Sequence, residues 1–252
     1  MTPAPSSLSF EPLFLVLAAV AALLYFRAAR AERPPSWRVA VFVAGLLLVA
    51  GALNSPLETI AVEYLLLFHL LQNVMIADWA PPLLILGLTP RMRSQIAGRG
   101  GAALEWLARP QVALPVWLVG WYGIHLALLY DFALRHPWAL NVEHLLLIAI
   151  GLLFWWPVLS DEPLDLGAPV KVGYLGAAFI GSAFLGLGLT FASTPFYDYY
   201  TETPRLWGLS AEEDQNFGGI LMNAEQAVVF LVAILYFVVK LMPEEERRSP
   251  GG

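Results

Sequence analysis

Seven long apolar stretches decide what this chain can fold into. A helix needs roughly 20 mostly apolar residues to cross the hydrocarbon core of a bilayer, which is about 30 Å thick. Stretches suited to this occupy residues 12–26, 37–53, 60–88, 111–130, 139–159, 170–192 and 218–241. The alternation of apolar and polar residues that marks a membrane β-barrel is absent from the sequence. We therefore expect an all-α membrane protein, with residues 1–252 forming one polytopic domain built as a seven-transmembrane-helix bundle.

The composition excludes several classes of protein. Only 13% of the 252 residues are charged, against about 25% in an ordinary soluble domain. The net charge of −6 gives no basic surface, so we expect no nucleic-acid partner. The sequence has no cysteine, which excludes disulfides, iron–sulfur clusters and thiolate metal sites. A nucleophile–base arrangement and a phosphate-binding loop are also missing, and we do not expect an enzyme.

The loop charges predict the orientation of the bundle. Twelve of the 14 Lys and Arg residues fall in or beside loops expected on one side of the membrane. The two others, Arg135 and Arg205, fall on the opposite side. Because basic loops stay in the cytoplasm, we expect the N-terminus outside and the C-terminus cytoplasmic.

The third stretch carries features that a straight helix would not need. Pro81-Pro82 predicts a kink, or an early end with a re-entrant tail. Asp78 precedes this break, and we expect it to bind backbone amides freed by the kink or to relay protons.

Glu63 and Glu143 lie near the outer interface and are expected to extend toward the headgroups. The tyrosines of residues 193–217 are expected to form an interfacial belt.

Three histidines and a methionine fall at one depth. If each residue rises about 1.5 Å, His69, His125 and His144 lie about 8–14 Å from the outer boundary. Met222 falls at a similar depth in the last predicted helix. Imidazole suits copper, and thioether sulfur suits Cu(I) in particular. The pattern predicts a copper site with His69, His125, His144 and Met222 as ligands.

Amide side chains accompany these candidate ligands. Gln72 and Asn73 share a helix face with His69, and Asn141 lies one turn above His144. We expect these three amides to orient the imidazoles through hydrogen bonds. Other interpretations of the histidines stay open at this point: hydrogen bonds between packed helices, a zinc site, or axial ligation of haem.

A series of short motifs resembles a known family. In chain order these are Ser55–Thr59 (SPLET), His69–Asn73 (HLLQN), Ala80–Leu83 (APPL), Trp121 with His125, Leu129–Asp131 (LYD), Glu143–His144, Phe154–Pro157 (FWWP), Asp161–Pro163 (DEP), Thr194–Pro195, Asp214–Gln215 and Gly218–Met222 (GGILM). Over about residues 37–240 the chain is similar to the multi-spanning CtaG family, assembly factors of haem–copper cytochrome c oxidase.

The resemblance implies a role in maturing the copper centre of the oxidase at the outer side of a bacterial plasma membrane. An oxidase subunit and the lipid bilayer are then the expected partners. The chain departs from the family at two places. Asn73 stands where the family has a second histidine, and Asn223–Glu225 stands where it has Trp-Val-Pro. Because an amide is a poor ligand for Cu(I), we expect a bound metal to rely on the three histidines and Met222.

Two other functions compete with copper delivery. The chain could be a scaffold that stabilises an oxidase subunit without binding metal, or a membrane protein that binds haem through a histidine pair. A retinal protein is excluded, because its Schiff-base lysine would have to lie in the middle of a helix, and Lys240 lies at the cytoplasmic end of the last predicted helix.

Overall fold

Helices account for all the regular secondary structure in the described part of the chain. The computed structural model describes residues 2–248, with side chains to residue 241. Six helices in this range are long and apolar enough to cross a membrane, and a bent helix pair brings the number to seven. They are α1 (Pro12–Glu32), α2 (Ser36–Leu53), the continuous segment Leu66–Gly87, α9 (Pro137–Leu159), α10 (Ala168–Phe191), α12 (Ala211–Arg248), and the pair α7 (Pro110–Ile124) with α8 (Ala127–Arg135).

The third predicted helix is wrong at its start. Residues 60–63 belong to a separate short helix, α3 (Pro56–Glu63), and the backbone breaks at Tyr64, which has φ −136°. The segment that follows comprises α4 (Leu66–Val74), the π-helix η1 (Met75–Trp79) and α5 (Ala80–Gly87). The expected irregularity at Pro81-Pro82 is therefore one π-helical turn placed just before the prolines, and α5 continues without re-entering.

The prolines explain why Gly151 is glycine. Pro81 has no N–H, so the carbonyl of Ala77, four residues earlier, lacks its helical donor. α9 approaches η1 closely at this carbonyl: a Cβ added to Gly151 would lie 2.2 Å from the Ala77 oxygen. Only a residue without a side chain allows this approach.

The fourth predicted helix is also interrupted. Residues 111–130 were expected as one helix, but α7 ends at Ile124 and α8 starts at Ala127, with a bend of 66° between them. His125 occupies the C-cap of α7, and its Nδ1 lies 2.7 Å from the carbonyl oxygen of Trp121. α7 therefore ends where the His125 side chain forms a hydrogen bond with a backbone carbonyl of its last turn.

The remaining boundaries differ little from the sequence prediction. α2, α9 and α10 begin or end within a few residues of the expected positions, while α1 continues to Glu32 and α12 starts at Ala211. The connection after α5 forms α6 (Pro90–Leu107), which is bent at Gly101, where φ is +52°. A short helix, α11 (Asp198–Glu202), lies in the loop between α10 and α12.

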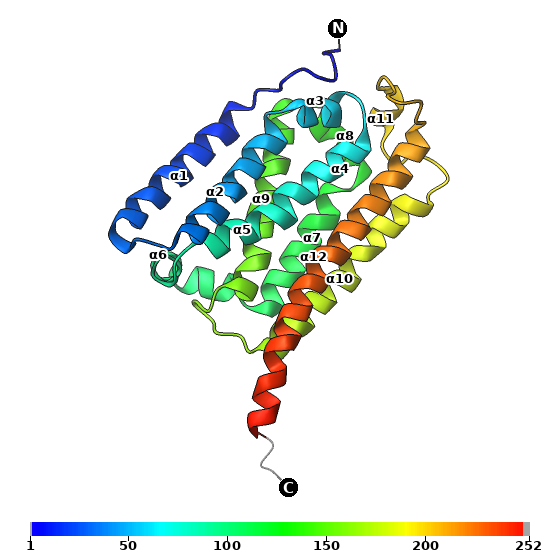
Figure 1. Ribbon diagram of the computed structural model, residues 1–252. Coiled ribbons are helices and arrows are strands. Elements are labelled where there is room, and N and C mark those ends of the chain that lie inside the picture. The colour runs from blue at the N-terminus through cyan, green and yellow to red at the C-terminus, as the bar shows by residue number, and fades with distance from the viewer. Residues whose placement is uncertain (1, 249–252) are drawn as a thin grey trace.

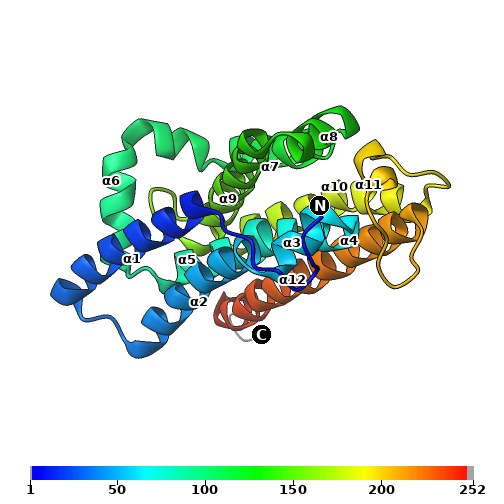
Figure 2. The same ribbon diagram turned by 90° about the horizontal axis from the view of Figure 1, so that it is seen from above.

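The segment Leu66–Gly87 and α9 form the centre of the bundle. In their most apolar windows 61% and 56% of residues are buried, against 11% in α1. Figures 1 and 2 show α1 on one flank and α10 beside α12 on the opposite flank. The N-terminus, α3, α8 and α11 lie at one end, whereas α6 and the C-terminal end of α12 lie at the other (Figure 1). The orientation of these ends across the membrane stays a prediction from the loop charges.

The close approach of α9 to η1 at Gly151 predicts that alanine at this position destabilises the protein, although alanine usually stabilises a helix. Alanine is favoured over glycine inside a helix by up to about 1 kcal/mol, so propensity alone predicts that Gly151→Ala stabilises α9. The clash with the Ala77 carbonyl oxygen opposes this stabilisation, because displacing backbone atoms costs more free energy than displacing the end of a side chain. We expect Gly151→Ala to lower the free energy of unfolding by about 1–3 kcal/mol.

Gly176→Ala is the matched control, because nothing lies within 4 Å of a Cβ added at that position in α10. Reversible unfolding in mixed micelles, followed by circular dichroism, compares the two variants. A Gly151→Ala protein as stable as Gly176→Ala would contradict the close approach of α9 to η1.

Candidate functional site

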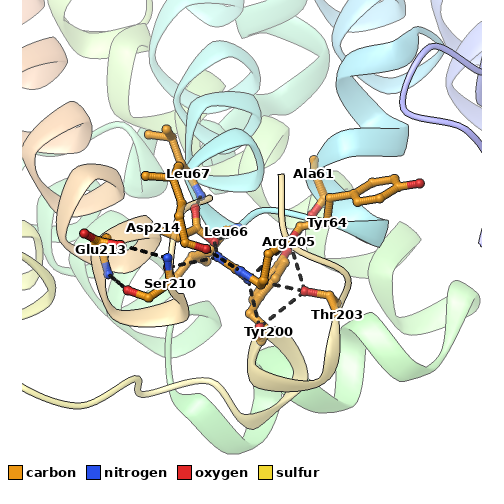
Figure 3. A network of polar contacts seen from close by, with 11 residues as sticks. Ala61, Tyr64, Leu66, Leu67, Tyr200, Thr203, Arg205, Ser210, Glu213 and Asp214 are labelled. Atoms are coloured by element: carbon orange, nitrogen blue, oxygen red, sulfur yellow. Dashed lines mark hydrogen bonds and ion pairs between the residues drawn. The ribbon is translucent and has the colours of Figure 1, made fainter. Parts of the chain in front are cut away.

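The break at Tyr64 leaves the first amides of α4 without helical partners, and Asp214 pairs with them. Asp214, in the first turn of α12, accepts hydrogen bonds from the backbone N–H groups of Leu66 and Leu67, each at 2.9 Å. An anionic acceptor is favoured at a helix N-terminus because of the helix dipole. The carboxylate of one helix therefore fixes where another begins (Figure 3).

Arg205 completes this arrangement, which we call the Asp214 clamp (Asp214, Arg205, Leu66 and Leu67). Its Nη2 donates to Asp214 Oδ2 at 2.9 Å, and its Nη1 donates to the carbonyl of Tyr200 at 3.0 Å. Thr203 donates to the carbonyl of Tyr64 at 2.9 Å, so the loop also pairs a carbonyl freed by the break. The clamp thus joins α4, α12 and the α11 loop (Figure 3).

Beside the clamp, Tyr200 fixes the protonation of His69. The Tyr200 hydroxyl donates to the carbonyl of Ala61 at 2.6 Å and lies 2.8 Å from His69 Nδ1. Burial raises the pKa of Tyr200 well above its ordinary value, so the hydroxyl keeps its proton. Because that single proton goes to Ala61, His69 Nδ1 must donate to the hydroxyl, and His69 Nε2 keeps a free lone pair.

The free lone pair of His69 faces an acid. His69 Nε2 lies 3.5 Å from Glu143 Oε1, and both side chains are buried. His144, the next residue on α9, has its ring centroid 5.9 Å from that of His69. A lone pair and a carboxylate oxygen that face each other in a buried place repel unless a proton or a cation lies between them.

His125 joins the group through Tyr130. The Tyr130 ring centroid lies 5.0 Å from that of His69 and 5.7 Å from that of His125. The Trp121 carbonyl can only accept, so His125 Nδ1 carries the proton and His125 Nε2 also keeps a free lone pair. Two histidines therefore have one ring nitrogen fixed by a hydrogen bond and the other available, the arrangement typical of metal-binding histidines.

Unpaired polar atoms concentrate in this group. We call it the histidine cluster (His69, Asn73, His125, Tyr130, Glu143 and His144). In the part of the chain with described side chains, sixteen buried side-chain nitrogen or oxygen atoms have no hydrogen-bond partner, and eight belong to the cluster. Buried polar atoms are normally paired. Half of the unpaired buried polar atoms among the described side chains therefore lie in this one cluster.

The other predicted site residues lie in different surroundings. Met222 is buried in α12 and belongs to the main apolar core. The Gln72 amide donates to the carbonyl of Ala52 at 2.9 Å and to the carboxyl group of Glu58, so its N–H groups serve α2 and α3 and not an imidazole. Asn73 lies beside Glu143, and Asn141 is half-buried in the first turn of α9. Among the described residues, no three His, Asp or Glu side chains are arranged as a ready-made metal site.

A second polar contact lies deeper, between η1 and α12. Asp78 accepts a hydrogen bond from Gln226 Nε2 at 3.5 Å, and the Trp79 indole donates to the carboxyl group of Glu225. The expectation that Asp78 binds backbone amides is therefore wrong; its partner is a side chain of α12. The π-helical turn makes its own backbone hydrogen bonds, which removes the need for such a role.

Three members of the site were not identified as such from the sequence. Glu143 is buried against His69 and does not extend to the headgroups as expected. Tyr197 and Tyr200, expected in an interfacial belt, are buried as well, with 1% and 2% of their surface exposed. Glu143 directly precedes His144, and that adjacency was the one signal that could have indicated its role.

The comparison with protein families identifies the chain. Residues 12–244 match the model of the cytochrome c oxidase caa3 assembly factor family, Caa3_CtaG. The chain belongs to this family. The Caa3_CtaG match runs from the start of α1 into the last turns of α12 and includes both polar regions described above, and it confirms the family resemblance found in the motifs.

The relatives of this Caa3_CtaG protein include longer proteins of mycobacteria. An uncharacterised protein of Mycobacterium bovis is 23% identical over 199 residues, and one of Mycobacterium leprae is 24% identical over 202 residues. These alignments cover 71% and 72% of this chain but 30% of each relative. The chain therefore spans about a third of the length of the curated relatives that it matches. No solved structure matches it.

The Asp214 clamp generates a prediction about stability. In Asp214→Asn the new side chain has one acceptor oxygen, and its NH₂ group faces donors, so it cannot serve both α4 amides and Arg205. We expect a loss of roughly 1.5–3 kcal/mol in the free energy of unfolding. Thermal unfolding in detergent, followed by near-ultraviolet circular dichroism, measures it.

Glu213→Gln is the matched control one residue away. Glu213 accepts from the Ser210 N–H in a capping box, a hydrogen bond that Gln can replace. It should change stability by less than about 0.5 kcal/mol. Equal effects of the two substitutions would show that the clamp contributes no more than an ordinary surface cap.

Proposed function

We propose that this protein assists cytochrome c oxidase assembly by holding a copper ion in the histidine cluster and passing it to an oxidase subunit at the outer side of the plasma membrane. Copper is the cargo of this process and not a resident cofactor. The observation that carries the proposal is the pair of free Nε2 lone pairs on His69 and His125, each set by a hydrogen bond at Nδ1.

The chemistry of the cluster fits a copper ion. Imidazole nitrogen is a good copper ligand, and His144 has two ring nitrogens without partners in the described residues. Glu143 lies next to His69, where a carboxylate would offset the positive charge of a buried Cu(I). Met222 is the candidate soft fourth ligand, from α12.

Because the described residues hold no ready-made metal site, the proposal requires the ligands to come together when copper enters. A carrier must release its ion, and ligands that come together only when copper enters bind it less tightly than a rigid cage does. His69 and His144 are neighbours already, and the Tyr130 ring packs against both His69 and His125.

Copper titration of ligand variants tests the proposal. Purified protein is incubated with Cu(I), washed, and its copper measured by elemental analysis; oxidase maturation is measured in cells that lack the native gene. We expect His144→Ala to lose copper and to block maturation. Asn73→His should retain more copper, and Met222→Leu should retain less while folding normally.

His136→Ala is the control, because His136 lies outside the cluster, with its Nδ1 against the Phe132 carbonyl. It should match the wild type in both assays. If the wild type takes up no more copper than His144→Ala, yet His144→Ala still blocks maturation, the non-metal scaffold function replaces copper delivery. A haem absorption band in the purified protein would favour haem binding.

The hydrogen bond from His69 Nδ1 to the Tyr200 hydroxyl gives a separate prediction. Tyr200→Phe removes the acceptor for His69 Nδ1, so His69 can protonate at Nε2 and lose its free lone pair. Removing such a partner typically weakens metal binding by about 10–100-fold, and we expect this loss in competition titrations with a Cu(I) chelator. Tyr199→Phe, at the half-buried neighbour, should leave the affinity unchanged.

A further inference from the structure

A groove at the opposite end of the molecule combines basic and apolar side chains. It has a volume of about 720 Å³ and lies between α12 and α10 on one side and α2, α5 and α9 on the other. Four basic residues line it against one acidic residue, Asp161. The basic ones are Arg38, Arg93, Lys171 and Lys240.

The two arginines are held close together and partly out of water. Arg38 donates to the carbonyl of Leu86 at 2.8 Å, and Arg93 donates to that of Leu159 at 2.6 Å, so each binds the last turn of a helix. Burial, and then repulsion from the Arg38 charge, lowers the pKa of Arg93. Arg93 Nε has no partner among the described residues. Two like charges in such a position are stabilised by an anion between them.

The apolar part of the groove has the length of a lipid chain. It follows α12 from Val228 to Lys240, thirteen residues that span about 18 Å. One leaflet of the hydrocarbon core is about 15 Å thick. Val228 and Val232 are each 63% exposed on this face, so the surface is open to the bilayer.

We propose that this groove binds one anionic phospholipid, with its phosphate at Arg38 and Arg93 and an acyl chain along Val228 and Val232. The basic side chains of the groove favour an anionic headgroup. Its long apolar surface favours a lipid with an acyl chain over free phosphate. Basic pockets between transmembrane helices bind anionic lipid headgroups for the same reasons. The site is independent of the histidine cluster at the other end.

Lipid retention by the full-length protein tests this. The protein, purified in detergent and stripped of lipid, is incubated with phosphatidylglycerol or phosphatidylcholine, and bound lipid is counted by native mass spectrometry. We expect selective retention of phosphatidylglycerol. Arg93→Gln should weaken it by about fivefold, corresponding to about 1 kcal/mol for one charge. Arg91→Gln, at an exposed position two residues earlier on α6, should not.

Because Arg93 also binds the end of α9, a second pair of variants leaves the arginines intact. Val232→Trp should block the acyl path and lower phosphatidylglycerol retention, while Leu231→Trp, on the neighbouring position outside the groove, should not. Thermal stabilisation should follow phosphatidylglycerol and not inorganic phosphate. Equal retention of both lipids, equal stabilisation by inorganic phosphate, or full retention in Arg93→Gln and Val232→Trp would each overturn the proposal.

Discussion

The pairing of backbone amides at the start of α4 is the constraint on which the site depends. In a membrane, an interrupted helix must find partners for the groups that it frees, because little water is present to bind them. Asp214 supplies these partners from α12, and Arg205 holds Asp214 in place. Without this pairing α4 would have no fixed origin, and His69, in the first turn of α4, would have no fixed position relative to Glu143.

The same logic explains why the loop between α10 and α12 is ordered around the site. Arg205 and Thr203 bind carbonyls of the broken segment, and Tyr200 enters between α3 and α4 to reach His69. The helix break thus frees backbone donors and acceptors, and residues of the loop form hydrogen bonds with them. The loop then sets the protonation of a buried histidine. The hydrogen bonds that compensate for the break thus leave His69 with its proton on Nδ1 and a free lone pair on Nε2.

The sequence predicted most of the helices because each is long and apolar, and length is what a bilayer demands. It did not predict the breaks at Tyr64 and His125. At both, the freed backbone groups are paired by distant side chains or by a local histidine, which leaves no signal in the hydrophobic pattern. The depth argument placed the three histidines at one level, and His69 and His144 are neighbours in the structure. The adjacency of His69 to Glu143 depends on helix rotation around the break, which hydrophobicity does not encode.

The π-helical turn at Met75–Trp79 has a consequence for depth. In such a turn, residues five apart occupy the same face, whereas residues four apart do so in the preceding α4. His69, Asn73 and Asp78 are spaced by four and then five, so they form one column along the helix. The column is about 13 Å long and ends where Glu225 and Gln226 meet it from α12. One additional residue in a turn thereby extends a line of polar groups from the histidine cluster to the contact between η1 and α12, and deleting that residue would turn Asp78 away from the line by about 100°.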